Sequence, residues 1–275
     1  MKKLILIVIL NLLVCHTSAF AKARYVSLAP STTEILFALG LDDEIVAVSS
    51  FCDYPPKALS KEKAGDFSHP NIEKIIALKP DYIFLTGLEQ APAIAELKRL
   101  GLNVYVSDPV NIKELFESIS DIGKITGKEK QAGELITDMK LRINAITAKT
   151  ELIPEDKKIK VFVEVWHDPL MTVGKDSFIS EIITIAGGKN IALDTKKAYS
   201  PFSPEEVISR NPCCIILTYM QKDKPLELMR RRLGWGQISA IKNNRIYNDI
   251  NPDILLRPGP RIAEAIEEVY KRLYP

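Results

Sequence analysis

Short apolar runs alternate along this chain with segments in which apolar residues recur at helical spacing. The first pattern is typical of buried strands and the second of amphipathic helices. Their alternation predicts an α/β protein with mostly parallel sheets, because helices then connect successive strands. The predicted strands are Tyr25–Ala29, Ile45–Val48, Tyr82–Leu85, Val104–Val106, Ile159–Val165, Cys214–Leu217 and Arg245–Tyr247.

Two helix starts are marked by capping residues. Ser31 and Glu34 have the spacing of a capping box, and the helix that they open is predicted to end at Gly40. Ser203 is an N-cap serine, followed by Pro204 at the first helical position and by two glutamates in the first turn. Both segments are therefore predicted to be helical from these residues onward.

The longest predicted helix lies in the middle of the chain. No proline occurs between Pro109 and Pro154, and the apolar residues that recur there at helical spacing are Ala132, Leu135, Ile136, Met139, Ile143 and Ile146. A single helix from Gly127 to Thr150 would hold 24 residues and span about 36 Å. A lone helix of this length with one apolar stripe is predicted to brace two bodies.

The sequences on the two sides of this helix resemble each other. Residues Asn71–Thr86 align with Ser203–Thr218 at an offset of 132. Upstream, Glu34–Gly40 matches Glu181–Gly187, so the matches follow the same order in both halves. Repetition at this scale indicates two equivalent structural units.

We therefore predict two similar α/β lobes joined by one long rigid helix, with a ligand cleft between the lobes. The N-terminal lobe is assigned to 22–126, the linking backbone helix to 127–154 and the C-terminal lobe to 155–275.

The first residues have the three parts of a secretory signal. Two lysines precede an apolar run that reaches Cys15, and an Ala-x-Ala cleavage motif ends at Ala21. The run is shorter than the roughly 20 residues that spanning a bilayer requires. We expect residues 1–21 to be a signal peptide cleaved after Ala21, and the mature protein to be periplasmic. Val14 replaces the small residue that precedes a lipidated cysteine, which argues against a lipid anchor at Cys15.

Charge and composition exclude several classes of protein. Lys and Arg number 37 against 35 Asp and Glu, a net charge of +2 that disappears when the signal peptide and its two lysines are removed. A nucleic-acid binder needs a basic face, which this balance does not supply. The apolar content of 46% excludes a disordered chain, and no heptad pattern persists to indicate a coiled coil.

Motifs for catalysis and metal binding are incomplete in this sequence. No phosphate-binding loop, nucleophile elbow or zinc-protease motif is complete, so we expect no catalytic residue and no enzyme activity. The cysteines Cys52, Cys213 and Cys214 form no C-x-x-C pair and are expected to be small buried hydrophobes. His69 and His167 are too few for a site that holds a bare metal ion, and no resident cofactor is expected.

Three segments carry a resemblance to a known family: Tyr25–Glu34, Val48–Pro56 and Asn71–Asp81. They resemble the periplasmic solute-binding proteins of the helical-backbone class, which serve ABC importers of vitamin B12 and ferric siderophores. Within that class the chain most resembles the cobalamin-binding member. The resemblance covers nearly the whole mature chain, and it implies two α/β lobes with the ligand held between them.

The resemblance implies a function as well as a fold. It implies a periplasmic, monomeric substrate-binding protein that captures a corrinoid and delivers it to the permease dimer of an ABC transporter, with no nucleic-acid partner. A ferric siderophore or haem binding protein of the same importer class is the first alternative. A two-lobed extracytoplasmic enzyme and a binding partner of a sensor protein are the others.

The resemblance also implies residue roles. Glu73 and Glu205, which the internal repeat superposes, match the glutamates that dock on the permease, one from each lobe. The implied ligand contacts are Phe51, Phe67, Trp166, Tyr199, Asp253, Ile254, Leu255, Leu256 and Arg257. His69 and His167 lie near cleft-facing loops, one in each lobe, which raises the hypothesis that they meet across a closed site and bind a chelated metal such as haem.

Overall fold

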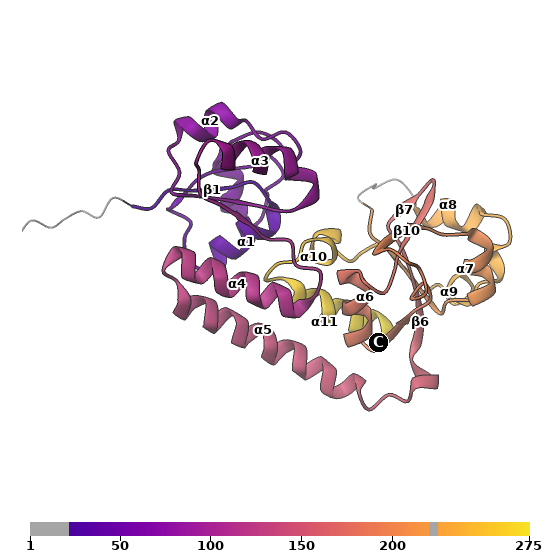
Figure 1. Cartoon of the computed structure of the whole chain (residues 1–275). Helices are drawn as coiled ribbons and strands as arrows, with labels where there is room; N and C mark the ends of the chain where they lie inside the picture. Colours follow the sequence, from indigo (N-terminus) through magenta and orange to yellow (C-terminus); the bar gives the residue numbers. More distant parts are fainter. Residues whose placement is uncertain (1–21, 220–224) are drawn as a thin grey trace, which may run out of the picture.

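The structure is a computed structural model that describes residues 22–219 and 225–275. Two lobes lie side by side above a pair of adjacent long helices (Figure 1). The predicted signal peptide, with Cys15, lies outside the described residues. Within the described part of the chain, no helix has both the length and the apolar character that crossing a membrane requires.

The N-terminal lobe is built on a parallel sheet of five strands in the order β3-β2-β1-β4-β5. Consecutive residues of a strand point to opposite faces, so the complete burial of Ile83 and Phe84 means that both faces of the sheet are covered. The strands are β1 (Tyr25–Ser27), β2 (Ile45–Val48), β3 (Glu62–Lys63), β4 (Tyr82–Leu85) and β5 (Val104–Val106). The helices are α1 (Pro30–Ala38), η1 (Pro56–Ser60), α2 (Ile72–Ala77), η2 (Leu88–Gln90) and α3 (Ala91–Arg99).

The C-terminal lobe repeats this plan with a parallel sheet in the order β12-β11-β6-β9. Its strands are β6 (Ile159–Glu164), β9 (Gly188–Asn190), β11 (Cys214–Leu217) and β12 (Ile246–Tyr247). Its helices are η3 (Glu155–Lys157), α6 (Phe178–Ile185), α7 (Pro204–Arg210), α8 (Pro225–Arg231), η4 (Trp235–Gln237), α9 (Ser239–Lys242), α10 (Pro252–Leu256) and α11 (Ile262–Leu273).

An antiparallel sheet in this lobe was not predicted. It has the order β10-β8-β7, with β7 (Trp166–His167), β8 (Leu170–Val173) and β10 (Tyr199–Pro201). The two-residue β7 is too short to show a periodicity, and β10 contains a proline, which is confined to edge positions in a sheet. All of the strands that were predicted are present, with ends that differ by at most two residues, whereas β3 and β9 were not predicted.

The internal repeat is confirmed in three dimensions. Asn71 caps α2 and Ser203 caps α7, and each helix is followed by a strand that pairs with the first strand of its lobe. Lys79 and Asn211, which the offset superposes, both have a φ of 46°, and each precedes a proline. The two halves therefore share an unusual left-handed turn between helix and strand as well as their order of elements.

The middle of the chain forms two helices, which corrects the prediction of one lone brace. Helix α4 (Ile112–Thr126) ends at Gly127, whose φ of 67° is left-handed, and α5 (Glu129–Thr150) then begins. Glycine adopts this conformation without strain, and it commonly ends helices for that reason. The assignment of Gly127 to the long helix was wrong, and the division into 22–126, 127–154 and 155–275 stays a prediction.

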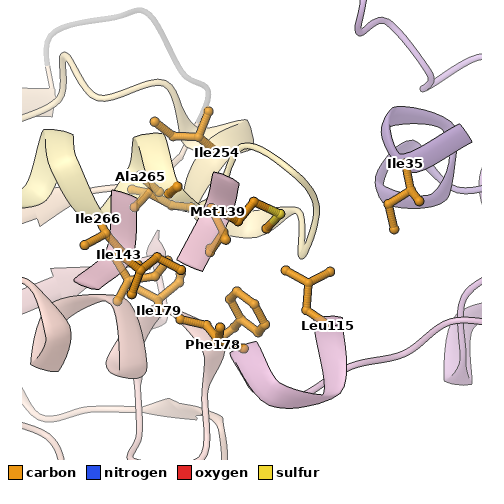
Figure 2. Packing of buried hydrophobic residues seen from close by; sticks show 14 of the residues in the cluster. Ile35, Leu115, Met139, Ile143, Phe178, Ile179, Ile254, Ala265 and Ile266 are labelled. Atoms are coloured by element: carbon orange, nitrogen blue, oxygen red, sulfur yellow. The ribbon is translucent and has the colours of Figure 1, made fainter. Parts of the chain in front are cut away.

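One hydrophobic core runs through both lobes and the helix pair. The predicted stripe of α5 faces it, with Ala132, Met139, Ile143 and Ile146 buried. Figure 2 shows Met139 and Ile143 in one cluster with Ile266 of α11 and Phe178 of α6. Because α5 packs on α4 as well as on α6 and α11, it joins the lobes through a shared core rather than as an isolated strut.

Two local predictions have different outcomes. The prediction of a capping box at Ser31 and Glu34 was wrong. Helix α1 begins at Pro30, so both residues lie inside the helix, where they are buried. Within this helix, the hydroxyl of Thr33 donates a hydrogen bond to the carbonyl of Ala29, the N-cap residue, at 3.0 Å. Cys52 and Cys214 are buried and unpaired, as expected, whereas Cys213 is half-buried.

The close approach of α4 and α5 at Gly123 gives the first prediction. A Cβ atom at this position would lie 2.6 Å from the Cβ of Ala132, so Gly123→Ala must push the two helices apart. We expect a loss of about 1 to 3 kcal/mol in the free energy of unfolding, measured by urea denaturation.

Gly133→Ala in α5 is the matched control, because a Cβ atom there meets nothing within 4 Å. Alanine is the better helix former, so this variant should gain up to about 1 kcal/mol. Equal stability changes in the two variants would show that helix propensity, and not close packing, governs Gly123.

Candidate functional site

A cavity of about 740 Å³ lies between the two lobes. Most of its wall follows the carboxyl ends of the parallel strands, where ligand sites of α/β proteins are found. The N-terminal lobe contributes Ala29, Pro30, Ser31, Phe51, Phe67, Ser68, Thr86, Gly87, Glu89, Asp108, Pro109 and Val110. The C-terminal side contributes Asp176, Ser177, Phe178, Ala198, Tyr199, Asp253, Leu256, Arg257 and Pro258.

The structure places three of the four predicted aromatic residues in this wall. Phe51 and Phe67 form an edge-to-face pair with ring centroids 6.4 Å apart, and Tyr199 lines the cavity from the other lobe. Trp166, in the short strand β7, is not part of this wall. Its indole N–H donates to the carbonyl of Asp168 at 2.9 Å, and its ring packs on His167.

The predicted loop 253–257 is divided between cavity and core. Asp253, Leu256 and Arg257 line the cavity. Ile254 and Leu255 are 2% and 1% exposed and belong to the hydrophobic core, which corrects their assignment as ligand contacts. The reason is that the segment forms α10, and successive residues of a helix point in different directions.

A buried glutamine that the sequence did not single out connects three loops of the cavity wall. The side-chain oxygen of Gln90 accepts a hydrogen bond from the backbone N–H of Thr86 at 2.9 Å. Its amide donates to the carbonyl of Phe67 at 2.7 Å and to that of Leu28 at 3.0 Å. Gln90 is fully buried, so these three hydrogen bonds hold the ends of the loops in fixed positions.

An ion pair crosses from one lobe to the other behind the cavity. Glu34 of α1 is 4% exposed and receives two hydrogen bonds from Arg261, at 2.6 and 2.8 Å. The guanidinium of Arg261 also lies 3.9 Å from the centre of the Tyr54 ring. Burial raises the pKa of Glu34 above its ordinary value, although Arg261 and Arg257 act in the opposite direction.

Arg257 makes a second set of contacts beside this pair. Its guanidinium lies 2.6 Å from Asp53 of the N-terminal lobe, 2.9 Å from Asp253 and 3.5 Å from Glu34. The hydrogen bond from Arg257 lowers the pKa of Asp53. Arg257 is therefore surrounded by carboxylates even though it lines the cavity.

The residue that the repeat matches to Glu34 also reaches across the lobes. Glu181 of α6 accepts a hydrogen bond from the backbone N–H of Ile112, the first residue of α4, at 2.8 Å. Burial raises the pKa of Glu181. Both interlobe glutamates thus occupy equivalent positions in the two lobes. The internal repeat aligned Glu34 with Glu181, but the sequence alone did not show that either contacts the other lobe.

The two histidines lie apart from the wall of this cavity. His69 is exposed and contacts Asp66, and His167 packs against the rings of Trp166 and Tyr219. Neither lines the cavity, so the structure does not bring them together there. Among the described residues, no cluster of three or more His, Cys, Asp or Glu side chains is arranged to hold a metal ion.

Two lobes of parallel sheets with a cavity between them form the architecture of a periplasmic binding protein. The chain belongs to this family, because residues 26–251 match the sequence profile of the periplasmic binding protein family. An uncharacterised ABC transporter substrate-binding lipoprotein of Bacillus subtilis is 38% identical over 92% of this chain and 80% of its own length.

The chain is also similar to a second curated protein and to a solved structure. The vitamin B12-binding protein of Vibrio cholerae is 31% identical over 91% of this chain and 88% of its own length. The crystal structure of a possible iron-binding, periplasmic solute-binding protein from Staphylococcus epidermidis has a TM-score of 0.81 and 34% identity. It covers 92% of this chain and 98% of that protein. The family and these relatives are substrate-binding proteins rather than enzymes.

The interlobe ion pair gives a prediction for stability. Glu34→Gln keeps the shape of the side chain but leaves Arg261, whose side chain is 12% exposed, without its carboxylate. Removing one partner of a buried pair is strongly destabilising, so we expect a loss of about 2 to 4 kcal/mol in the free energy of unfolding.

Urea denaturation measures this loss, and Glu117→Gln is the control. Glu117 pairs with Lys113 at 3.7 Å on an exposed helix face, where such a change costs less than about 1 kcal/mol. Equal losses in the two variants would contradict a structural role for the buried pair.

Proposed function

We propose that this protein captures a corrinoid outside the cytoplasm and delivers it to the membrane permease of an ABC importer. The family and its relatives support the general role of substrate binding for transport. The similarity to a vitamin B12-binding protein supports a corrinoid as the ligand. The proposal contains no catalytic step and no resident cofactor, and it treats the protein as a monomer.

One observation carries the choice of a large ring-shaped ligand. The cavity has a volume of about 740 Å³ and aromatic side chains on both walls, with Phe51 and Phe67 opposite Tyr199. Aromatic rings provide a large contact area with few rotatable bonds, which suits the faces of a macrocycle. A ferric siderophore or haem is the alternative ligand for this cavity. The similarity to a possible iron-binding protein supports this alternative.

We assign docking on the permease to Glu73 and Glu205. Both are exposed in the first turns of repeat-related helices, α2 and α7, which lie on different lobes (Figure 1). Ser203 donates a hydrogen bond to Glu205 at 2.6 Å and lowers the pKa of that carboxyl. Two exposed carboxylates on a framework of fixed spacing offer complementary charge to basic residues of a partner.

Export is part of the same proposal. Cleavage after Ala21 would give a mature protein that begins at Lys22. The relative from Bacillus subtilis is a lipoprotein, so anchoring through Cys15 is the competing outcome. N-terminal sequencing and mass spectrometry of the exported protein distinguish these two products.

The ligand assignment predicts which aromatic residues matter. Phe67→Ala and Tyr199→Ala should each weaken binding of cyanocobalamin by about tenfold, because each removes a ring from the cavity wall. Trp166→Ala should leave the affinity within about twofold, because Trp166 lies outside this wall.

Isothermal titration calorimetry with cyanocobalamin, haemin and a ferric trihydroxamate makes this comparison. Micromolar or tighter binding of cyanocobalamin is the expected result. Binding of haemin or the ferric chelate without cyanocobalamin would overturn the corrinoid assignment and keep the transport role.

The docking assignment predicts a separation of binding from transport. The double variant Glu73→Ala, Glu205→Ala should abolish uptake in cells while ligand affinity stays unchanged, because neither residue lines the cavity. The matched control is Glu62→Ala, Glu206→Ala, which removes neighbouring acids that pair with Lys74 and Arg210 within the chain. Normal uptake by the first double variant would refute docking through these residues.

A further inference from the structure

Acidic side chains line both walls of the interlobe cavity. Glu89 and Asp108 belong to the N-terminal lobe, and Asp176 and Asp253 belong to the C-terminal side. Asp108 accepts a hydrogen bond from the hydroxyl of Thr86, a neutral partner, at 3.2 Å. A bound ligand would therefore have carboxylates on two opposite sides.

Among the described residues that line the cavity, Arg257 is the one basic side chain. It offsets Asp253 but not Glu89, Asp108 or Asp176, because its charge is already matched by carboxylates beside it. Asp53, Asp253 and Glu34 lie 2.6, 2.9 and 3.5 Å from its guanidinium, and its side chain is only 13% exposed. A carboxylate on a ligand would have to share Arg257 with these partners and would be repelled by them.

The nearest lysines in sequence do not change this balance. Lys175 lines an adjoining pocket of about 340 Å³ that shares Val110, Asp176 and Ser177 with the main cavity, but Lys175 is not part of the main cavity's wall. Lys197 precedes the lining residue Ala198 and is likewise absent from the wall. The described wall thus has an excess of negative charge with no unmatched cation.

From this charge pattern we propose that the cavity selects neutral or cationic metal chelates and rejects chelates that carry outward carboxylate or catecholate groups. The proposal rests on the proposed function only in taking this cavity as the ligand site. A neutral chelate with amide N–H groups at its edge can donate hydrogen bonds to the wall carboxylates. An anionic chelate must instead lose its hydration beside like charges.

The expected size of this selection follows from Coulomb's law. One added negative charge about 8 Å from a wall carboxylate lowers affinity by between about twofold and about thirtyfold, depending on the local dielectric constant. Repulsion from several carboxylates adds to this effect, and salt weakens it. Selection should therefore be strongest at low ionic strength.

The test uses two series of probes whose members share one chelate and differ mainly in charge. The first is cyanocobalamin against its monocarboxylate derivative, in which one peripheral amide is hydrolysed. The second is a linear ferric trihydroxamate with a free ammonium group, an acetylated form and a succinylated form. In whichever series binds, calorimetry in low salt should show the anionic member at least about tenfold weaker.

Variants of the protein connect this difference to the wall. Asp108→Asn with Asp176→Asn keeps the shape of both side chains and should reduce the difference within each series to about threefold or less. Asp156→Asn, an exposed acid outside the cavity, is the matched control and should leave the difference unchanged.

The outcomes separate the two proposals. Charge-ordered binding in the trihydroxamate series alone would refute the corrinoid assignment and support charge selection. Anionic members that bind as tightly as neutral ones would overturn charge selection, as would preferred binding of haemin or a ferric tris-catecholate. Failure of every probe to bind would overturn both proposals.

Discussion

The carboxylate of Glu34 and the guanidinium of Arg261 meet across the boundary between the lobes, 2.6 and 2.8 Å apart and almost fully buried. Neither charge can remain largely buried without its partner at low cost. The pair therefore fixes where α1 stands relative to α11. Because the loops of the cavity wall are attached to these elements, the width of the cavity depends on this contact.

The shared hydrophobic core also limits movement of the two lobes relative to each other. Helix α5, whose Met139 and Ile143 belong to this core, contacts both α6 and α11, and the core continues through α4 to the N-terminal sheet. Wide opening would expose part of this core to water, at a cost proportional to the apolar area exposed. Small rotations that preserve the packing of α5 are the motions that remain inexpensive.

The sequence predicted those features that local patterns determine. Seven of the nine strands in the two parallel sheets followed from their apolar runs, whereas β3 and β9, which are short and largely polar, did not. The cap at Ser203 followed from a preference of helix starts. Ile254 and Leu255 were misassigned because a loop was assumed where α10 forms. Gln90 and Glu34 were missed as structural contacts because their partners lie up to 227 residues away in sequence. Such contacts depend on tertiary packing, and a single sequence carries no local signal for them.

The hydrogen bonds of Gln90 have a consequence for the kinetics of ligand capture. Three wall segments are attached to one buried side chain, so they are ordered before any ligand arrives. Binding then loses little loop entropy, and encounter does not wait for a loop to find its shape. For the proposed ligand, association at this wall would then be limited by diffusion and by the angle of approach, and the contacts made after binding would set the residence time.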